Sequence, residues 1–145
     1  MSTIDHHAPG TCAWVELFTP DAEAASRFYT ALFGWELFRA PMGPDSWYHI
    51  FRLGGRDVAA AFTMTPAMLE SGISPHWFTY FATGNADETA SKAVTLGGTV
   101  LKPPFDVHDV GRMAAIGDPQ GAVFGLWQPK SHQGIACRDE PGTLC

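Results

Sequence analysis

The chain has 145 residues and a mass of 15.7 kDa, which suits one ordinary domain and is too short for two large independent ones. Apolar residue types make up 46% of the sequence and charged types 17%, a balance that supports a buried core and argues against disorder over most of the length. The formal net charge is −6 and the basic residues are scattered, so a nucleic-acid partner is not expected.

The sequence also lacks the signals of membrane insertion and export. No apolar run approaches the roughly 20 residues that a membrane-spanning helix needs, and residues 1–10 have neither the basic start nor the apolar stretch of a secretory signal. We therefore expect a soluble, cytoplasmic protein. Cys12, Cys137 and Cys145 are widely spaced and odd in number, which favours free thiols.

The first predicted elements are a strand at 12–18 and a helix that ends at Gly34. Thr19 is expected to cap this helix, Pro20 suits its first position, and Asp21 complements the helix dipole. Apolar residues then recur at helical spacing up to the glycine, which is a common helix stop. Three further strands follow, at 35–38, 47–53 and 57–64.

The same order of elements recurs in the second half of the chain. A strand at 76–82 precedes a helix that Asn85 caps, with Glu88 three residues later as in a capping box. Adding 64 to the residue number carries the first helix onto the second, from Ala22 to Ala86 at one end and from Gly34 to Gly98 at the other. Three strands again follow, at 99–102, 112–116 and 122–127. The sequence therefore predicts two homologous βαβββ modules.

The predicted organisation has five parts. They are an N-terminal arm at 1–11, a first module at 12–64, a linker at 65–75, a second module at 76–129 and an irregular tail at 130–145. The linker is expected to form a short helix or to cover one edge with a few apolar side chains. The tail shows no periodicity, so we expect it to be poorly ordered or to lie on a partner, and to be dispensable.

Two motifs connect this pattern to a known family. They are FYTALFGW at 28–35, which closes the first helix, and GRMAAIGDPQGAVFGLW at 111–127, which forms the last hairpin. Together with the repeat, residues 12–129 resemble the vicinal oxygen chelate superfamily, which includes glyoxalase I, extradiol dioxygenases, fosfomycin-resistance enzymes and bleomycin-binding proteins. They are most similar to the glyoxalase-like proteins of bacteria. The resemblance implies a single α+β domain in which two βαβββ modules form a cleft from curled mixed sheets, with the helices packed outside.

The resemblance also implies where a metal would bind. Metal-using members carry one ligand on the first strand and one on the last strand of each module, and these four positions align with Trp14, Ala61, Phe78 and Gly125. None of these side chains has a donor atom for a divalent ion. We therefore predict no metal and no cofactor.

Strand alternation predicts which side chains line the cleft, because residues two apart share a face. Alternation from the aligned first-strand and last-strand positions selects, among others, Trp14, Glu16, Phe18, His76, Phe78, Tyr80 and Trp127. The resemblance and the apolar pattern add Trp47, His49, Phe51 and Met113. The predicted ligand contacts are Trp14, Glu16, His49, Phe51, His76, Phe78, Tyr80, Met113 and Trp127. Either these rings form a slot on which a flat ligand stacks, or they fill the space as a packed core.

Glu16 and His76 are the candidate catalytic residues. A carboxylate among apolar side chains would have a raised pKa and suit general acid–base chemistry. The alternative is a structural pair with Arg112 or Arg52, or a place at the wet mouth of the cleft. Glu16, His49 and His76 are also the ligand types of a non-haem iron site, so a displaced metal is a further hypothesis beside ordinary hydrogen-bonded histidines.

The sequence thus favours a metal-independent, glyoxalase-like homodimer that binds a small, partly aromatic organic molecule. A dimer is expected because long edge strands need cover. One alternative is a lyase or isomerase in which Glu16 moves a proton, with or without an unusual metal. Another is a non-catalytic interaction module whose cleft is core.

Overall fold

The computed structural model describes residues 3–145 and shows an α+β chain. The elements follow the order β1 (Cys12–Thr19), α1 (Ala22–Phe33), β2 (Glu36–Gly43), β3 (Ser46–Leu53), β4 (Arg56–Thr63), α2 (Pro66–Glu70), β5 (His76–Ala82), α3 (Ala86–Thr95), β6 (Thr99–Val107), β7 (Gly111–Gly117) and β8 (Val123–Pro129). A strand, a helix and three strands therefore occur twice, which confirms the predicted α+β class with two βαβββ modules.

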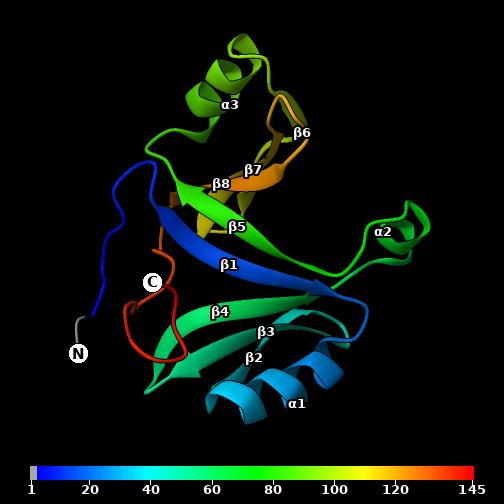
Figure 1. Cartoon of the computed structure of the whole chain (residues 1–145), viewed down its shortest axis with the longest axis vertical. Coiled ribbons are helices and arrows are strands. Elements are labelled where there is room, and N and C mark those ends of the chain that lie inside the picture. The colour runs from blue at the N-terminus through cyan, green and yellow to red at the C-terminus, as the bar shows by residue number, and fades with distance from the viewer. Residues whose placement is uncertain (1–2) are drawn as a thin grey trace. The chain divides into compact units, whose positions relative to one another are not determined.

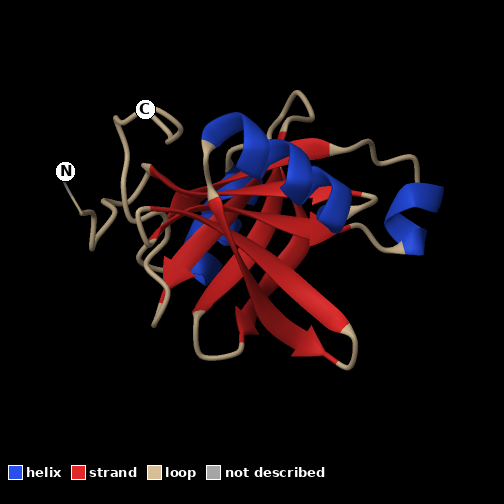
Figure 2. Ribbon diagram, turned by 90° about the horizontal axis from the view of Figure 1, so that it is seen from below, coloured by secondary structure: helices blue, strands red, loops and turns tan. Residues whose placement is uncertain are grey.

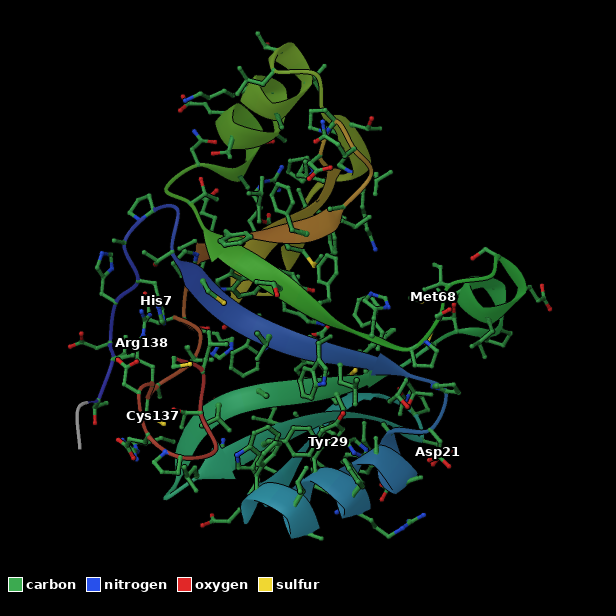
Figure 3. The ribbon with its side chains drawn as sticks, viewed as in Figure 1. His7, Asp21, Tyr29, Met68, Cys137 and Arg138 are labelled. Carbon is green, nitrogen blue, oxygen red and sulfur yellow. The ribbon has the colours of Figure 1, made fainter. Side chains whose placement is uncertain are left out.

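The first of two compact units contains residues 15–77 and 135–145. Its strands lie in the order β2-β3-β4-β1, with β1 parallel to β4 and the other neighbours antiparallel. Helix α1 packs on β2, β3 and β4 (Figure 1). Figure 3 shows Tyr29 directed from α1 toward these strands, where it contacts Phe51 at a ring-centre distance of 6.4 Å.

The second compact unit contains residues 5–14 and 78–134. Its strands lie in the order β5-β8-β7-β6, with β5 parallel to β8 and the others antiparallel. Helix α3 packs on β6, β7 and β8. The buried residues of this core are Ala90, Ala114, Ile116 and Leu126, so the second unit repeats the layering of the first.

The helix ends follow the expected chemistry with one correction. The N-cap of α1 is Asp21, whose carboxylate accepts from the backbone N–H of Ala24 at 3.0 Å, and not Thr19 as predicted. Thr19 Oγ1 instead accepts from the backbone N–H of Asp21 at 3.3 Å, one step before the helix. Asn85 caps α3 through the backbone N–H of Glu88, as predicted, and Gly34 ends α1 in the left-handed conformation.

The linker forms the short helix α2 (Figure 2), which is one of the two structures expected for it. Thr65 caps this turn through the backbone N–H of Met68. Among the described residues, no helix is long and apolar enough to cross a membrane.

The tail at 130–145 is irregular (Figure 2), but the prediction that it is poorly ordered is wrong. Ile135 and Cys137 are buried, and Cys137 belongs to the core that includes Leu17 and Phe51. Figure 3 shows Cys137 within the loop that the tail forms beside the first unit.

Polar contacts fasten the tail along its length. The backbone N–H of Ala136 donates to the carbonyl of Asp57 at 2.7 Å, and the Trp35 indole N–H donates to the carbonyl of Gly142 at 2.7 Å. Arg56 binds Glu140 through two hydrogen bonds of 3.1 and 3.0 Å. The tail is therefore part of the first unit's core. The sequence did not reveal this, because helical and strand periodicities do not detect an irregular segment.

Deletion of residues 135–145 is accordingly expected to destabilise the first unit. Loss of the buried Ile135 and Cys137 side chains costs about 3 kcal/mol or more, since a buried aliphatic side chain contributes about 1.5–3 kcal/mol. Urea unfolding followed by circular dichroism measures this change, with the exposed Cys145→Ser substitution as control. Equal midpoints for the truncated and full chains would show that the tail is dispensable after all.

Candidate functional site

Strand pairing places Glu16 on the face of the first unit's sheet that lies opposite α1. Leu17 is paired with Ala61, and both belong to the core that contains Ala22 of α1. Glu16 and its partner Ala60 therefore point the other way, because successive side chains alternate between the two faces. The predicted orientation of Glu16, away from the helix, is confirmed.

Tyr48 binds the Glu16 carboxylate. The Tyr48 hydroxyl donates a hydrogen bond to Glu16 Oε2, and Glu16 is 9% exposed. Tyr48 lies two residues before Ile50, which is paired with Ala60, so Tyr48 shares the face of Glu16. Sequence analysis did not select Tyr48, and the register of β3 against β4 was the signal that would have identified it.

The two arginines considered as partners of Glu16 bind other carboxylates. Arg52 Nε donates to Asp57 at 2.7 Å, and its guanidinium lies 4.2 Å from the centre of the Phe38 ring. Arg112 donates to Asp87 at 2.8 and 3.0 Å. Arg52 and Arg112 are therefore engaged by Asp57 and Asp87, and the hydrogen bond described for Glu16 comes from Tyr48.

Aromatic rings continue this face beyond the carboxylate. Phe18 lies two residues after Glu16 on β1 and contacts Phe62, its partner on β4, at a ring-centre distance of 5.6 Å. The His76 imidazole meets the edge of Phe18 at 5.0 Å. We call the surface formed by Glu16, Tyr48, Phe18, Phe62 and His76 the Glu16 face.

The hydrogen bonding of His76 fixes its tautomer. Nδ1 lies 2.7 Å from the carbonyl oxygen of Ser74, and a carbonyl accepts only. Nδ1 therefore carries the proton in the neutral ring, and Nε2 is an acceptor. The two residues predicted to be catalytic, Glu16 and His76, thus both lie near Phe18, and both carry acceptor atoms.

The structure places His49 and Phe51 against α1, so their predicted inward orientation is wrong. His49 Nδ1 is 2.8 Å from Ser26 Oγ on α1, and Phe51 belongs to the same core as Ala22. Their partners on β4, Ala61 and Ala59, face the helix as well. The predicted facing of the side chains on β3 and β4 was displaced by one residue. A shift of one residue exchanges the two faces of a strand.

This correction also separates the three residues of the iron hypothesis. His49 faces α1, whereas Glu16 and His76 border Phe18 on the other face. In residues 3–145, no group of three or more histidine, cysteine, aspartate or glutamate side chains has the geometry to hold a metal ion.

The remaining predicted ligand contacts come together in the second unit. Phe78 meets Tyr80 at a ring-centre distance of 4.9 Å, Tyr80 meets Trp127 at 6.3 Å, and Tyr80 Oη lies 3.9 Å from Met113 Sδ. Trp14 packs edge-on against His132 at 4.7 Å. These aromatic residues are buried. Sequence analysis assigned no role to His132, whose carbonyl accepts from the Trp127 indole N–H at 2.9 Å.

The four positions that align with metal ligands do not fit a metal. Gly125 is paired with Tyr80, two residues after Phe78, so the equivalent partner in the first unit is Ala60, opposite Glu16. The repeat offset had selected Ala61, one residue away. Either alanine offers only a methyl group. A Cβ added at Gly125 would lie 2.3 Å from Tyr80 Cδ1, so the ring occupies the space that a carboxylate there would need.

Comparisons with known proteins agree on one family. The sequence model of the Glyoxalase/Bleomycin resistance protein/Dioxygenase superfamily matches residues 5–126. The protein named "Putative glyoxylase CFP32" of Mycobacterium tuberculosis is 45% identical over 145 residues, which cover 99% of this chain and 55% of that protein. "Anthracycline biosynthesis protein DnrV" of Streptomyces peucetius is 35% identical over 147 residues, which cover 94% and 54%. The chain thus spans about half the length of the curated relatives it matches.

Solved structures show the same fold. Methylmalonyl-CoA epimerase from Mycobacterium tuberculosis superimposes with a TM-score of 0.60 at 14% identity, over 83% of this chain and 89% of the other. A methylmalonyl-CoA epimerase in complex with methylmalonyl-CoA and NH4+ gives 0.59 at 17% identity, over 83% and 94%.

The environment of His49 predicts a pH-dependent stability. Burial lowers the pKa of His49 below its ordinary 6.5, Glu23 opposes this shift, and Arg39 adds to it. The unfolded chain therefore binds a proton more readily than the folded one between the two pKa values. The free energy of unfolding should fall as the pH drops below about 6.5. His49→Gln should flatten this slope in urea titrations between pH 5.5 and 7.5, and the exposed His108→Gln should not. Parallel slopes in all three proteins would contradict the assignment.

Proposed function

The chain belongs to the glyoxalase/bleomycin resistance protein/dioxygenase superfamily, and we propose that it binds a small, partly aromatic organic molecule on the Glu16 face without the family's metal. Glu16 and Tyr48 supply the polar contacts, and Phe18, Phe62 and His76 supply rings. The other predicted ligand contacts lie in the second unit, are not part of this site and stay a prediction from the sequence; they are Trp14, Phe78, Tyr80, Met113 and Trp127.

The hydrogen bond from Tyr48 to Glu16 is the observation that supports this proposal best. A nearly buried carboxylate costs free energy unless hydrogen bonds compensate for its lost hydration. The Tyr48 hydroxyl supplies one such hydrogen bond and fixes one carboxylate oxygen. An oriented acceptor beside aromatic rings is the composition of a small-molecule site, where a few polar groups orient a ligand held by apolar contacts.

The names of the relatives favour the same class of ligand. The family's description includes resistance to bleomycin, and the Streptomyces relative is named for anthracycline biosynthesis. Anthracyclines contain flat, hydroxylated ring systems. Such a ring stacks on Phe18 or Phe62 while a phenolic O–H donates to the Glu16 carboxylate.

A second candidate function is acid–base catalysis of a lyase or isomerase reaction. The observation that favours it is the placement of two acceptors near the same residue, Phe18: Glu16 lies two residues before it on β1, and the His76 ring contacts it. Either group is suited to accept a proton from a bound molecule. Turnover of a ligand that binds, with loss of turnover but not of binding in His76→Gln, would distinguish catalysis from binding. The homodimer and the cytoplasmic location stay predictions from the sequence.

The proposal predicts specific losses in a binding titration. Alizarin, a dihydroxyanthraquinone, should bind more tightly than anthraquinone, which has no hydroxyl to donate. Glu16→Gln should weaken alizarin binding by about 10-fold or more, because a hydrogen bond to a charged group contributes about 1.5–3 kcal/mol. Calorimetric titration measures both affinities.

Tyr29→Phe is the matched control for Tyr48→Phe, since it also removes a tyrosine hydroxyl, but from a residue on the α1 side of the sheet. Tyr48→Phe should lower both alizarin affinity and stability, whereas Tyr29→Phe should leave the affinity unchanged. Unchanged affinity in Glu16→Gln would refute the proposal. A large fall in its melting temperature would assign Glu16 to structure.

The metal positions predict the result of elemental analysis. The purified protein should contain no stoichiometric transition metal, and a chelator should leave its melting temperature unchanged, because Trp14, Ala60, Phe78 and Gly125 offer no ligand atoms. One equivalent of nickel, zinc or iron would overturn this prediction.

A further inference from the structure

A pocket of about 300 Å³ opens in the first unit where the β2–β3 hairpin meets the start of α1. Its walls include Glu23 of α1, Asp45 in the hairpin turn, and Trp47 and His49 of β3. Glu16 and Tyr48 do not line it, although Phe62 of the Glu16 face does. A site here is therefore separate from the two polar groups of the proposed function.

The His49 imidazole presents a lone pair to this pocket. Ser26 Oγ lies 2.6 Å from the carbonyl of Ala22, which accepts only, so the single hydroxyl proton of Ser26 is donated there. His49 Nδ1, 2.8 Å from the same Ser26 oxygen, must then be the donor in their contact. The proton of the neutral ring is thus on Nδ1, and Nε2 is an acceptor.

This acceptor is buried against a second one. His49 is 3% exposed, and its Nε2 lies 3.4 Å from Glu23 Oε1. Within residues 3–145, the contact of His49 Nε2 with Glu23 is not a hydrogen bond, and Nε2 makes none elsewhere. A lone pair facing a carboxylate oxygen leaves room for a donor that serves both atoms, and a positively charged donor gains most.

The charges around the pocket favour a cation. Glu23 accepts from Arg39 at 2.9 and 2.8 Å, and this pairing lowers the pKa of Glu23, which keeps it ionised. Asp21 and Asp45 also line the pocket, and its lining residues include no lysine or arginine. The N-terminus of α1 by itself attracts anions, but the Asp21 carboxylate already caps it. An anionic ligand would meet three carboxylates.

One wall of the pocket is an accessible aromatic surface. Trp47 is 50% exposed and is paired with Pro41, beside Met42, which is also 50% exposed. An indole face attracts an ammonium ion more strongly than the other aromatic rings do. The two acceptors suit the N–H donors of an amine, and the exposed indole suits its positive charge and its carbon skeleton.

We propose that this pocket binds the ammonium group of a small organic amine, which donates to His49 Nε2 and Glu23 Oε1 and places its charge against the Trp47 indole. The acceptors supply direction, and the indole selects an organic cation over a strongly hydrated metal ion. The proposal does not depend on Glu16 or Tyr48, so it and the proposed function can fail separately.

Calorimetric titration with 2-phenylethylamine and with 2-phenylethanol tests this directly. The two probes share the ring and chain and differ in the cationic group. The amine should bind, and the alcohol should bind at least 10-fold more weakly. Equal affinity for the two probes would overturn the proposal. A titration with zinc chloride that shows tight binding, while the amine shows none, would overturn it in favour of a metal site.

Substitutions in the pocket test whether its side chains contact the amine. Trp47→Leu should weaken amine binding by about 3- to 10-fold, in the range of a partly exposed cation–π contact, while Trp77→Leu, an exposed tryptophan that does not line the pocket, should not. Glu23→Gln should weaken it further. Arg39→Met should strengthen it, because the Glu23 carboxylate then loses its competing cation.

The Arg39 variant keeps the test decisive if Glu23→Gln disturbs the fold. Weaker amine binding in Arg39→Met would show that Glu23 acts through its ion pair, and would overturn the proposal. Nitrogen-15 NMR of the histidine rings gives an independent readout. Addition of amine should shift the His49 Nε2 resonance, and no shift at saturation would exclude the proposed contact.

Discussion

The parallel pairing of β1 with β4 determines what each face of the first unit does. With Leu17 opposite Ala61, the apolar side chains of both strands meet α1, and Glu16 opposite Ala60 must point away. A slip of one residue would direct the carboxylate into a core of Phe51, Val58 and Ala22, at a cost of several kcal/mol. Hydrophobic burial on one face therefore fixes a charge on the other, within reach of the Tyr48 hydroxyl. The candidate site follows from the packing of the opposite side.

Much of this fold could be predicted because its signals are local. The caps at Asn85 and Gly34 and the two βαβββ modules depend on neighbouring residues and on a repeat that is visible in the sequence. The orientation of β1 was also predictable, since Leu17 and Glu16 differ sharply in polarity. Strand β3 was harder, because WYHIF carries bulky side chains on both faces and has no such contrast.

The errors came from contacts between segments distant in sequence. Ala60 lies 44 residues after its partner Glu16 (60 − 16), whereas Gly125 lies 45 residues after its partner Tyr80 (125 − 80), so a constant offset of 64 fails at β4 by one residue. The contact of His49 with Ser26, 23 residues away, settles the direction of β3 and has no local signature. Tyr48 was missed for the same reason. The tail was misjudged because the burial of Ile135 and Cys137 does not create a period in an irregular segment.

The buried thiol of Cys137 allows the opening of the tail to be measured chemically. Cys145 is exposed and accessible to a thiol reagent in the folded protein, whereas Cys137 is fully buried and burial raises the pKa of its thiol. The reactive thiolate at Cys137 thus requires the segment to leave the core first. Its labelling rate, compared with that of an unfolded peptide, reports how often this segment opens while the rest of the unit stays folded. Cys137 thereby reports local opening of the tail without an engineered cysteine.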